Sequence, residues 1–334
     1  MISSLSSLGQ LSKKAGGGVV ASAPLWVAVG DGSLIVTSTD GSNNWTALPS
    51  NKRGNLANYV TSVAYGKDNL GANLWVAVGA GSIIAKSSDG QSWIDVTTVG
   101  GSTGTISFGR AVAYANGLWV AGGDGGSRIA FSSNGINWTP ANNVAGITRT
   151  WGISYGNGNW IAVCNGVSTT IISTDGSNWS DMSSQVAIYG RNLAYGNNKW
   201  IIVGDPGGMM YGNVGTGWVY PSNNGGIVRG YGVAYGKDGT GAGLWVVVGT
   251  GSVIATSADG TNWSAVPTIN CGGLTAGYSV AYGKDSNGTG LWVAIGAGSI
   301  IVTSQNGSIW RAVPSVSLGG ITTTAGYGGV AYKP

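Results

Sequence analysis

Short apolar stretches bounded by polar turns run along the whole chain and predict β-strands. A typical stretch is "LWVAVG" at 74–79, which is followed by the polar sequence "KSSDGQSW" at 86–93. Runs of this length that are rich in β-branched and aromatic residues and lie between turn residues are typical of strands. The pattern therefore predicts an all-β protein with many short strands.

Two series of tryptophans show that this pattern is a repeat. The first series follows an apolar strand and the second ends the polar turn, 18 or 19 residues later, and the whole pattern recurs every 40–49 residues. A period in this range, with four short strands per unit, is the signature of a β-propeller. The first series is Trp26, Trp75, Trp119, Trp160, Trp200, Trp245 and Trp292, and the second is Trp45, Trp93, Trp138, Trp179, Trp218, Trp263 and Trp310.

The repeats predict seven four-stranded antiparallel blades over residues 25–334. Six units are complete, but the first begins directly at its second strand, at Leu25, and the last residues, 327–334, supply a first strand with nothing after it. We expect this C-terminal strand to complete the N-terminal blade, because a closed ring removes exposed strand edges. In the second unit the four predicted strands are 61–66, 74–79, 82–87 and 93–98.

The polar turn has a structural explanation. An Asp or Asn side chain accepts hydrogen bonds from backbone N–H groups two residues on, a Gly takes the positive φ of a tight turn, and the Trp packs as a hydrophobic anchor. Catalytic or calcium-binding roles for these carboxylates are disfavoured, because the residues recur at the same turn position. The turn residues are Asp40, Asp89, Asn134, Asp175, Asp259 and Asn306, and the same reasoning covers Asp68, Asp238 and Asp285 in a second set of loops.

The turn sequence Ser-x-Asp-Gly-x-x-Trp resembles the repeats of Asp-box (bacterial neuraminidase repeat-like) propellers. The resemblance covers roughly residues 25–332, although most turns here are one residue shorter than the family's and the turn at 211–218 lacks both Ser and Asp. Sialidases within that resemblance use an arginine triad, a Tyr/Glu pair and an Asp acid/base. This chain has no glutamate and no Arg-Ile-Pro motif before the first box. Glycoside hydrolysis is therefore the least favoured activity.

Composition points away from enzymes. The 334 residues include 62 glycines, only 8% are charged, and histidine is absent. Without His or Glu, imidazole bases, His metal sites and Glu acid/base pairs are excluded, so we predict a non-enzymatic protein with no cofactor and no metal. The two cysteines, Cys164 and Cys271, are expected to be free thiols.

Charge and termini restrict the partners. The net charge of +4 is thinly spread, which argues against nucleic-acid binding, and no apolar stretch is long enough for a membrane span. Residues 1–24 lack the continuous apolar core of a signal peptide. We interpret them as a flexible N-terminal arm and a candidate tether to other protein subunits of an assembly.

A group of arginines and aromatic residues is predicted near the central channel. Counting back from the tyrosine that ends each first strand, the positions four and six residues earlier carry most of them. Alternation along a strand would put both positions on one side, around the mouth of the channel. The candidate ligand-binding residues are Arg110, Arg149, Arg191, Arg229, Tyr59, Trp151, Tyr231 and Tyr278.

Two interpretations of this group remain open. Arginine forks bind carboxylate, sulfate or phosphate, and aromatic rings bind sugar faces or cations, so the group could be a site for an anion or an acidic glycan. Alternatively, the side chains fill the channel and pair with Asp31, Asp124 or Asp205. Both interpretations place them on the face that carries the irregular connections, where propeller function is usually found.

The functional prediction is a structural or interaction propeller. Short "STDG-NW" turns alternating with "LWVAVG" resemble propellers of phages, large DNA viruses and bacterial surface proteins, which implies a virion component such as a tail, fibre, spike or capsid-associated protein acting in assembly or host attachment. The alternative is a lectin that binds acidic glycans of a host surface at the channel mouth. The expected location is a virion or extracellular particle surface reached without a signal peptide, with the cytoplasm as the alternative.

Overall fold

The computed structural model describes residues 25–32, 34–56, 59–96, 106–144, 146–186, 188–297, 300–314 and 328–334. The N-terminal arm predicted for residues 1–24 lies outside this range. The described residues form β-strands and three short 3-10 helices, η1 (Ser50–Lys52), η2 (Ser183–Gln185) and η3 (Thr268–Asn270). Within these ranges no helix has the length and apolar character needed to span a membrane.

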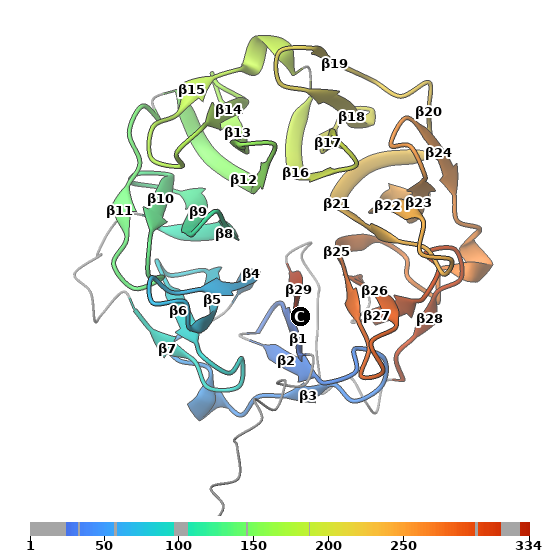
Figure 1. Ribbon diagram of the computed structural model, residues 1–334, viewed down its shortest axis with the longest axis horizontal. Helices are drawn as coiled ribbons and strands as arrows, with labels where there is room; N and C mark the ends of the chain where they lie inside the picture. The colour runs from blue at the N-terminus through green and yellow to red at the C-terminus, as the bar shows by residue number, and fades with distance from the viewer. Residues whose placement is uncertain are drawn as a thin grey trace, which may run out of the picture.

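The strands are arranged as a ring of four-stranded antiparallel blades around a central axis (Figure 1). In the described residues the pairings give seven such blades, and the innermost strand of each lies next to the axis. Blade 1 has β29 (Gly329–Lys333), β1 (Leu25–Val29), β2 (Ile35–Ser38) and β3 (Thr46–Ala47); blade 2 has β4 (Val60–Lys67), β5 (Asn73–Gly79), β6 (Ile84–Ser87) and β7 (Ile94–Asp95); blade 3 has β8 (Phe108–Ala115), β9 (Leu118–Asp124), β10 (Ile129–Ser132) and β11 (Thr139–Pro140); blade 4 has β12 (Ile147–Gly156), β13 (Asn159–Gly166), β14 (Thr170–Ser173) and β15 (Ser180–Asp181).

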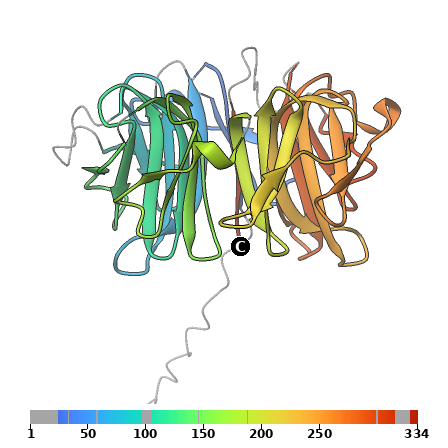
Figure 2. The same ribbon diagram turned by 90° about the horizontal axis from the view of Figure 1, so that it is seen from above.

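The remaining blades repeat this order, and the connections between strands lie on the two faces of the ring (Figure 2). Blade 6 gains one extra short strand, β20 (Asn223–Asn224), which pairs parallel to its outer strand. Blade 5 has β16 (Tyr189–Gly196), β17 (Lys199–Asp205), β18 (Gly208–Asn213) and β19 (Gly217–Val219); blade 6 has β21 (Ile227–Lys237), β22 (Gly243–Gly251), β23 (Ile254–Ser257) and β24 (Asn262–Ala265); blade 7 has β25 (Gly277–Lys284), β26 (Gly290–Gly296), β27 (Ile300–Ser304) and β28 (Arg311–Ala312).

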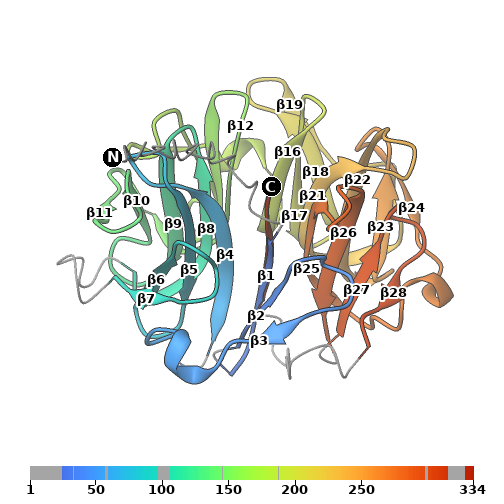
Figure 3. The ribbon, with the colours of Figure 1, turned by 60° about the horizontal axis from the view of Figure 1, so that its bottom comes forward.

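The C-terminal strand pairs with the first strand of the chain. β29 runs antiparallel to β1, with Leu25 opposite Lys333 and Ala28 opposite Val330, and the two strands lie side by side in Figure 3. Five residue pairs of this ladder join the two ends of the propeller, so blade 1 is assembled from both. The prediction of an all-β propeller is confirmed.

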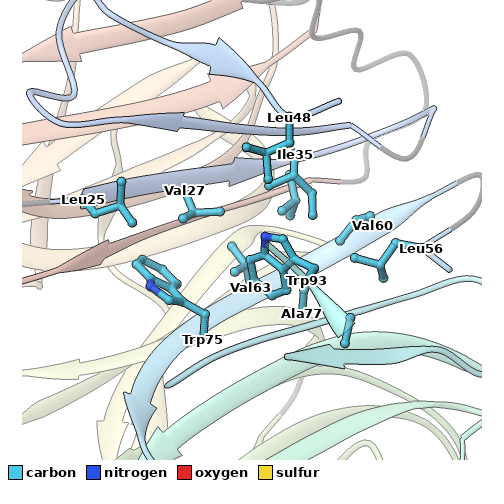
Figure 4. Packing of buried hydrophobic residues seen from close by; sticks show 12 residues of the cluster. Leu25, Val27, Ile35, Leu48, Leu56, Val60, Val63, Trp75, Ala77 and Trp93 are labelled. Carbon is cyan, nitrogen blue, oxygen red and sulfur yellow. The ribbon is translucent and has the colours of Figure 1, made fainter. Parts of the chain in front are cut away.

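The hydrophobic core lies between blades rather than within one sheet. Figure 4 shows one such layer, in which Leu25, Val27 and Ile35 of blade 1 pack on Trp75 and Trp93 of blade 2. Three of these side chains, those of Val27, Ile35 and Trp75, are completely buried. Large apolar side chains of this kind are worth roughly 1.5–3 kcal/mol each when buried. The sequence therefore repeats with the same period as the hydrophobic interfaces between blades.

Five of the seven interfaces also have a glycine against a tyrosine ring of the next blade, at Gly66, Gly156, Gly196, Gly236 and Gly283. In blade 2, Tyr65 packs on Trp75 with ring centroids 5.0 Å apart, and all seven blades contain such a Tyr–Trp pair among the described residues. A Cβ added at Gly66 would lie 2.2 Å from Cγ of Tyr114 in the next blade. The repeated "AYG" sequence therefore supplies a ring to one interface and the space for a ring to the next.

The polar turns show the hydrogen bonds that a turn role requires. In blade 2, Asp89 Oδ1 accepts hydrogen bonds from the Ser87 hydroxyl at 2.9 Å and the Gln91 backbone N–H at 2.7 Å. The Ser87 hydroxyl oxygen accepts the Gly90 N–H at 2.8 Å, and Trp93 Nε1 donates to the Gly90 carbonyl at 3.1 Å. Burial would raise the pKa of Asp89, but these hydrogen bonds outweigh it and lower the pKa.

Candidate functional site

A β-bulge near the start of the innermost strand in six of the described blades positions the candidate site. In blade 3, Gly109 pairs with Gly123 and Ala111 with Gly122, so Arg110 is an extra residue without a partner in the ladder. Bulges leave one residue unpaired and redirect its side chain. The same register shift occurs in six described blades, and the residues at the bulge are Thr61, Arg110, Trp151, Arg191, Tyr231 and Tyr278.

All six bulge residues line one cavity at the mouth of the central channel. The cavity has a volume of about 240 Å³. Polar residues one position further along the strands, Ser62, Asn192 and Ser279, and a set of aliphatic residues one position beyond them also line it. Arg110, Trp151, Arg191, Tyr231 and Tyr278 are thus brought together, as the sequence predicted.

The position six residues before the tyrosine is placed differently from the prediction. Tyr59, Arg149 and Arg229 do not line this cavity, because the bulge breaks the alternation on which the prediction relied. Instead, the backbone at two of these positions pairs with the preceding blade. Tyr59 forms a β-bridge with Asp31 between blades 2 and 1, and Arg149 forms one with Asp124 between blades 4 and 3.

Two aspartates each bind a pair of arginines. Asp124 accepts two hydrogen bonds from Arg110, both at 2.8 Å, and one from Nε of Arg149 at 2.7 Å. Each of these aspartates stands five residues after a tryptophan of the first series, at the end of the second strand. It therefore lies between the bulge residue of its own blade and the displaced arginine of the next blade. The two-point contact of Arg110 is the strongest geometry for such a pair.

The second aspartate repeats this arrangement two blades further on. Asp205 accepts hydrogen bonds from Nε of Arg191 at 2.9 Å and from Nε of Arg229. The side chain of Arg229 is half exposed, whereas that of Arg110 is only 7% exposed. The interpretation that the arginines pair with Asp124 and Asp205 is thus met in the structure, although the bulge arginines still line the cavity.

Aromatic rings alternate with the guanidinium groups along the mouth. The Cζ atoms of Arg110 and Arg191 lie 4.4 Å and 5.1 Å from the ring centre of Trp151, and Arg191 Cζ also lies 5.3 Å from the ring of Tyr231. Tyr231 in turn meets Tyr278 edge to face at 5.6 Å. Cation–π contacts and the aspartates therefore fix the orientation of both guanidinium planes.

Burial and the neighbouring arginines shift the pKa of Asp124 in opposite directions. Partial burial would raise the pKa of Asp124, but the hydrogen bonds and charges of Arg110 and Arg149 outweigh burial and lower it. The hydroxyl of Tyr231 and the carboxylate of Asp205 raise the pKa of Arg229. Burial, followed by the charges of Tyr231 and Asp31, raises the pKa of Tyr278. At neutral pH Asp124 is therefore ionised, Arg229 is charged and Tyr278 is protonated.

Several residues of the site were missed by sequence reasoning. Ser62, Asn192 and Ser279 line the cavity below the arginines, and their signal was only their position one residue after the bulge.

No group of three or more Cys or Asp side chains able to hold a metal ion occurs in the described part of the chain. The turn residues Asp40, Asp89, Asn134, Asp175, Asp259 and Asn306 lie in turns after the third strands and are not among the residues that line the cavity.

The chain matches no protein-family profile and no curated protein sequence. Similar solved structures include the WD40 β-propeller domain of Doa1, which is 14% identical with a TM-score of 0.57 over 86% of this chain and 88% of that one. YCF48 from Cyanidioschyzon merolae is 14% identical, with a TM-score of 0.55 over 86% and 90% of the two chains. Virginiamycin B lyase from Staphylococcus aureus is 10% identical, with a TM-score of 0.56 over 82% and 87%. These similarities establish the β-propeller fold alone.

Proposed function

We propose that this protein is a non-enzymatic interaction propeller that serves as a structural component of a virion, such as a tail, fibre, spike or capsid-associated protein. The observation that carries the proposal is a set of exposed apolar side chains on the face that holds the channel mouth. Val167, Tyr189 and Val228, in three consecutive blades, are 90%, 58% and 67% exposed. Exposed apolar and aromatic residues beside arginines are typical of protein-binding surfaces.

The non-enzymatic part of the proposal is supported by the state of the carboxylates. A glycosidase needs a carboxylic acid that remains protonated near neutral pH and a second carboxylate at a suitable distance. Asp124 has a lowered pKa and is bound by Arg110 and Arg149. Asp205 is bound in the same way by two arginines. Asp124 is therefore not suited to donate a proton to a leaving group, and both carboxylate oxygens of Asp205 are occupied by guanidinium groups.

Kinship with Asp-box propellers is part of the same proposal. Six turns share a serine that contacts the Asp or Asn and accepts a hydrogen bond from the following glycine, as Ser38 does with Asp40 and Gly41. The blade 5 turn lacks this serine and uses Gly215 and Gly217 at positive φ. The virion assignment rests on the resemblance of the repeated phrases to phage and viral propellers.

The test is incorporation of the protein into its particle. The variant Val167→Asp/Tyr189→Asp/Val228→Asp adds charge to the exposed apolar side chains and should reduce the number of copies per purified particle at least about tenfold. A matched control, Leu70→Asp/Val214→Asp/Ile309→Asp, changes exposed apolar residues in turns of the opposite face. Copies are counted by quantitative immunoblotting of gradient-purified particles. Equal incorporation of both variants, or recovery of no wild-type protein with particles, contradicts the proposal.

The N-terminal arm gives a second, independent measurement. If residues 1–24 tether the propeller to other subunits, a protein beginning at Leu25 should fold but be absent from particles. Circular dichroism checks folding and the same immunoblot counts the copies. Unchanged incorporation would show that the arm is not the tether, while leaving the surface test intact.

A second candidate function, a lectin for acidic glycans, is favoured by the arginines that line the cavity. Arg110 and Arg191 both face a polar space at the end of the channel. Binding to sialylated or sulfated glycans on an array should be lost in Arg110→Gln and Arg191→Gln and weakened in Arg229→Gln. Binding that survives all three substitutions, or no binding to any acidic glycan, rejects this candidate.

A further inference from the structure

We infer that the channel mouth binds a tetrahedral oxyanion, a sulfate or phosphate group, between Arg110 and Arg191. The inference rests on the second candidate function, because it names the anionic group that this site recognises. It depends on three features of the cavity: donors at two depths, no carboxylate in the lining, and an excess of positive charge around the mouth.

Hydrogen-bond donors line the cavity at two successive depths. Arg110, Arg191 and Tyr278 stand at the bulge level. Ser62 and Ser279, one residue further along their strands, already use their hydroxyl oxygens to accept the backbone N–H groups of Val112 at 3.2 Å and Val330 at 3.4 Å. Their hydroxyl protons therefore remain for a ligand.

The side chain of Asn192 also uses its acceptor within the protein and keeps its donor for a ligand. Its Oδ1 accepts the backbone N–H of Leu193 at 2.7 Å, which leaves the amide Nδ2 group to donate toward the cavity that Asn192 lines. A planar carboxylate meets donors in one plane, whereas a tetrahedral oxyanion presents oxygens at two depths. Donors on two levels therefore favour the tetrahedral group.

Acceptors are turned away from the cavity. None of Asp124, Asp205 and Asn165 is among the residues that line it, and the acceptor Oδ1 of Asn165 is occupied by the indole N–H of Trp151 at 3.0 Å. Sugar hydroxyls need acceptors as well as donors, whereas a sulfate or phosphate group needs donors only. The faces of Trp151 that would stack on a sugar are instead covered by Arg110 and Arg191.

The charges around the mouth favour an anion. Four guanidinium groups stand against three carboxylates, those of Asp124, Asp205 and Asp31, which leaves a formal excess of one positive charge. Arg191 donates only its Nε to Asp205, and its two Nη groups form no hydrogen bond with the described residues. Because Trp151 and Tyr231 flank this guanidinium, its free edge is pre-oriented for an anion.

The test is isothermal titration calorimetry of the whole protein with sodium sulfate and with phosphate at pH 8, at constant ionic strength. We expect one site per chain, at which the two dianions compete. Asn192→Asp keeps the contact with the Leu193 N–H but places a negative charge in the cavity, so affinity for both ions should fall at least about tenfold. The matched control is Asn134→Asp, in a turn where four other blades already carry Asp.

A second variant protects the test against misfolding. The Tyr278 hydroxyl forms no hydrogen bond with the described residues, so Tyr278→Phe should preserve the fold and weaken sulfate binding about two- to fivefold. Absence of saturable dianion binding, or binding unchanged in both variants, overturns the inference.

N-acetylneuraminate distinguishes this inference from the lectin function. If it binds in an Arg191-dependent manner and sulfate does not displace it, the site is specific for a carboxylate and the tetrahedral assignment is wrong, while the glycan candidate stands. If sulfate and phosphate bind but no glycan does, the inference stands and the lectin function is rejected.

Discussion

The two arginine–aspartate groups should differ in their contribution to stability. We compare Asp124→Asn with Asp205→Asn, since each substitution removes one carboxylate charge between two guanidinium groups and keeps the side-chain shape. The two groups are matched in topology but not in burial. The arginines at Asp124, Arg110 and Arg149, are 7% and 37% exposed, whereas those at Asp205 are 28% and 49% exposed.

Burial sets the expected magnitudes. Breaking a buried ion pair costs about 3–5 kcal/mol, and an exposed one about 0–1 kcal/mol. Asp124 is 21% exposed and Asn still accepts one hydrogen bond, so we expect Asp124→Asn to cost about 2–3 kcal/mol and Asp205→Asn about 1 kcal/mol. An unfolding entropy of about 2 cal/mol/K per residue converts these costs to decreases in Tm of about 3–4 °C and 1–2 °C.

Differential scanning calorimetry at pH 7 measures both variants against wild type, and pH provides a second check. The pKa of Asp124 is lowered in the folded state, so its stabilisation is present above its ordinary pKa of about 3.9 and is lost as the pH falls through the lowered value. The difference between wild type and Asp124→Asn should therefore shrink below about pH 4. Equal decreases in Tm, or a difference that persists at acid pH, would refute the reasoning.

Three further predictions follow from other contacts. Gly122→Val should destabilise the protein, because a Cβ there lies 2.5 Å from Thr150 Cγ2, and Thr150→Gly should recover part of the lost stability. A double-mutant cycle by urea unfolding measures the coupling between the two positions, and strictly additive effects contradict the prediction. Ser87→Ala should cost about 1 kcal/mol through the loss of the Gly90 contact, whereas Asp89→Asn should be nearly neutral in Tm, since Asn occupies this turn position in two other blades. Burial raises the pKa of Cys164 to about 12, so a thiol reagent at pH 8 should label it only after unfolding, and rapid labelling of the folded protein contradicts this.

Much of the fold was predictable because its interfaces repeat. The Tyr–Trp contacts and the glycine that accepts the next ring recur at fixed spacing, so the period of the sequence fixes the strand order. The outermost strand of blade 2 differs from the prediction of 93–98: β7 covers Ile94–Asp95, Trp93 and Val96 are not part of it, and residues 97–98 lie outside the described residues. The ladder that joins blades 3 and 4 through Arg149 and Asp124 was not predictable, because it depends on how closely two blades approach.

The candidate site was predictable in one position and not in the other. Counting back four residues found every side chain that the bulge directs into the cavity. The arginines six residues back lie beside these side chains but do not line the cavity, since alternation does not continue through a bulge. A signal for the bulge was present in the sequence. Gly109, Gly190, Gly230 and Gly277 each precede a bulge residue, and a Cβ at any of them would lie 2.5–2.6 Å from a valine of the preceding blade.

The bulge also explains why chemical variety is concentrated at this position. Residues on either side of it pair in the ladder or pack between blades, so their identity is restricted by the ring. The bulge residue has no partner in the ladder and projects into the channel, so threonine, arginine, tryptophan and tyrosine are all accommodated there. The scaffold thus leaves the channel mouth as the place where ligand specificity can change without loss of the fold, as expected for a site on a rigid framework.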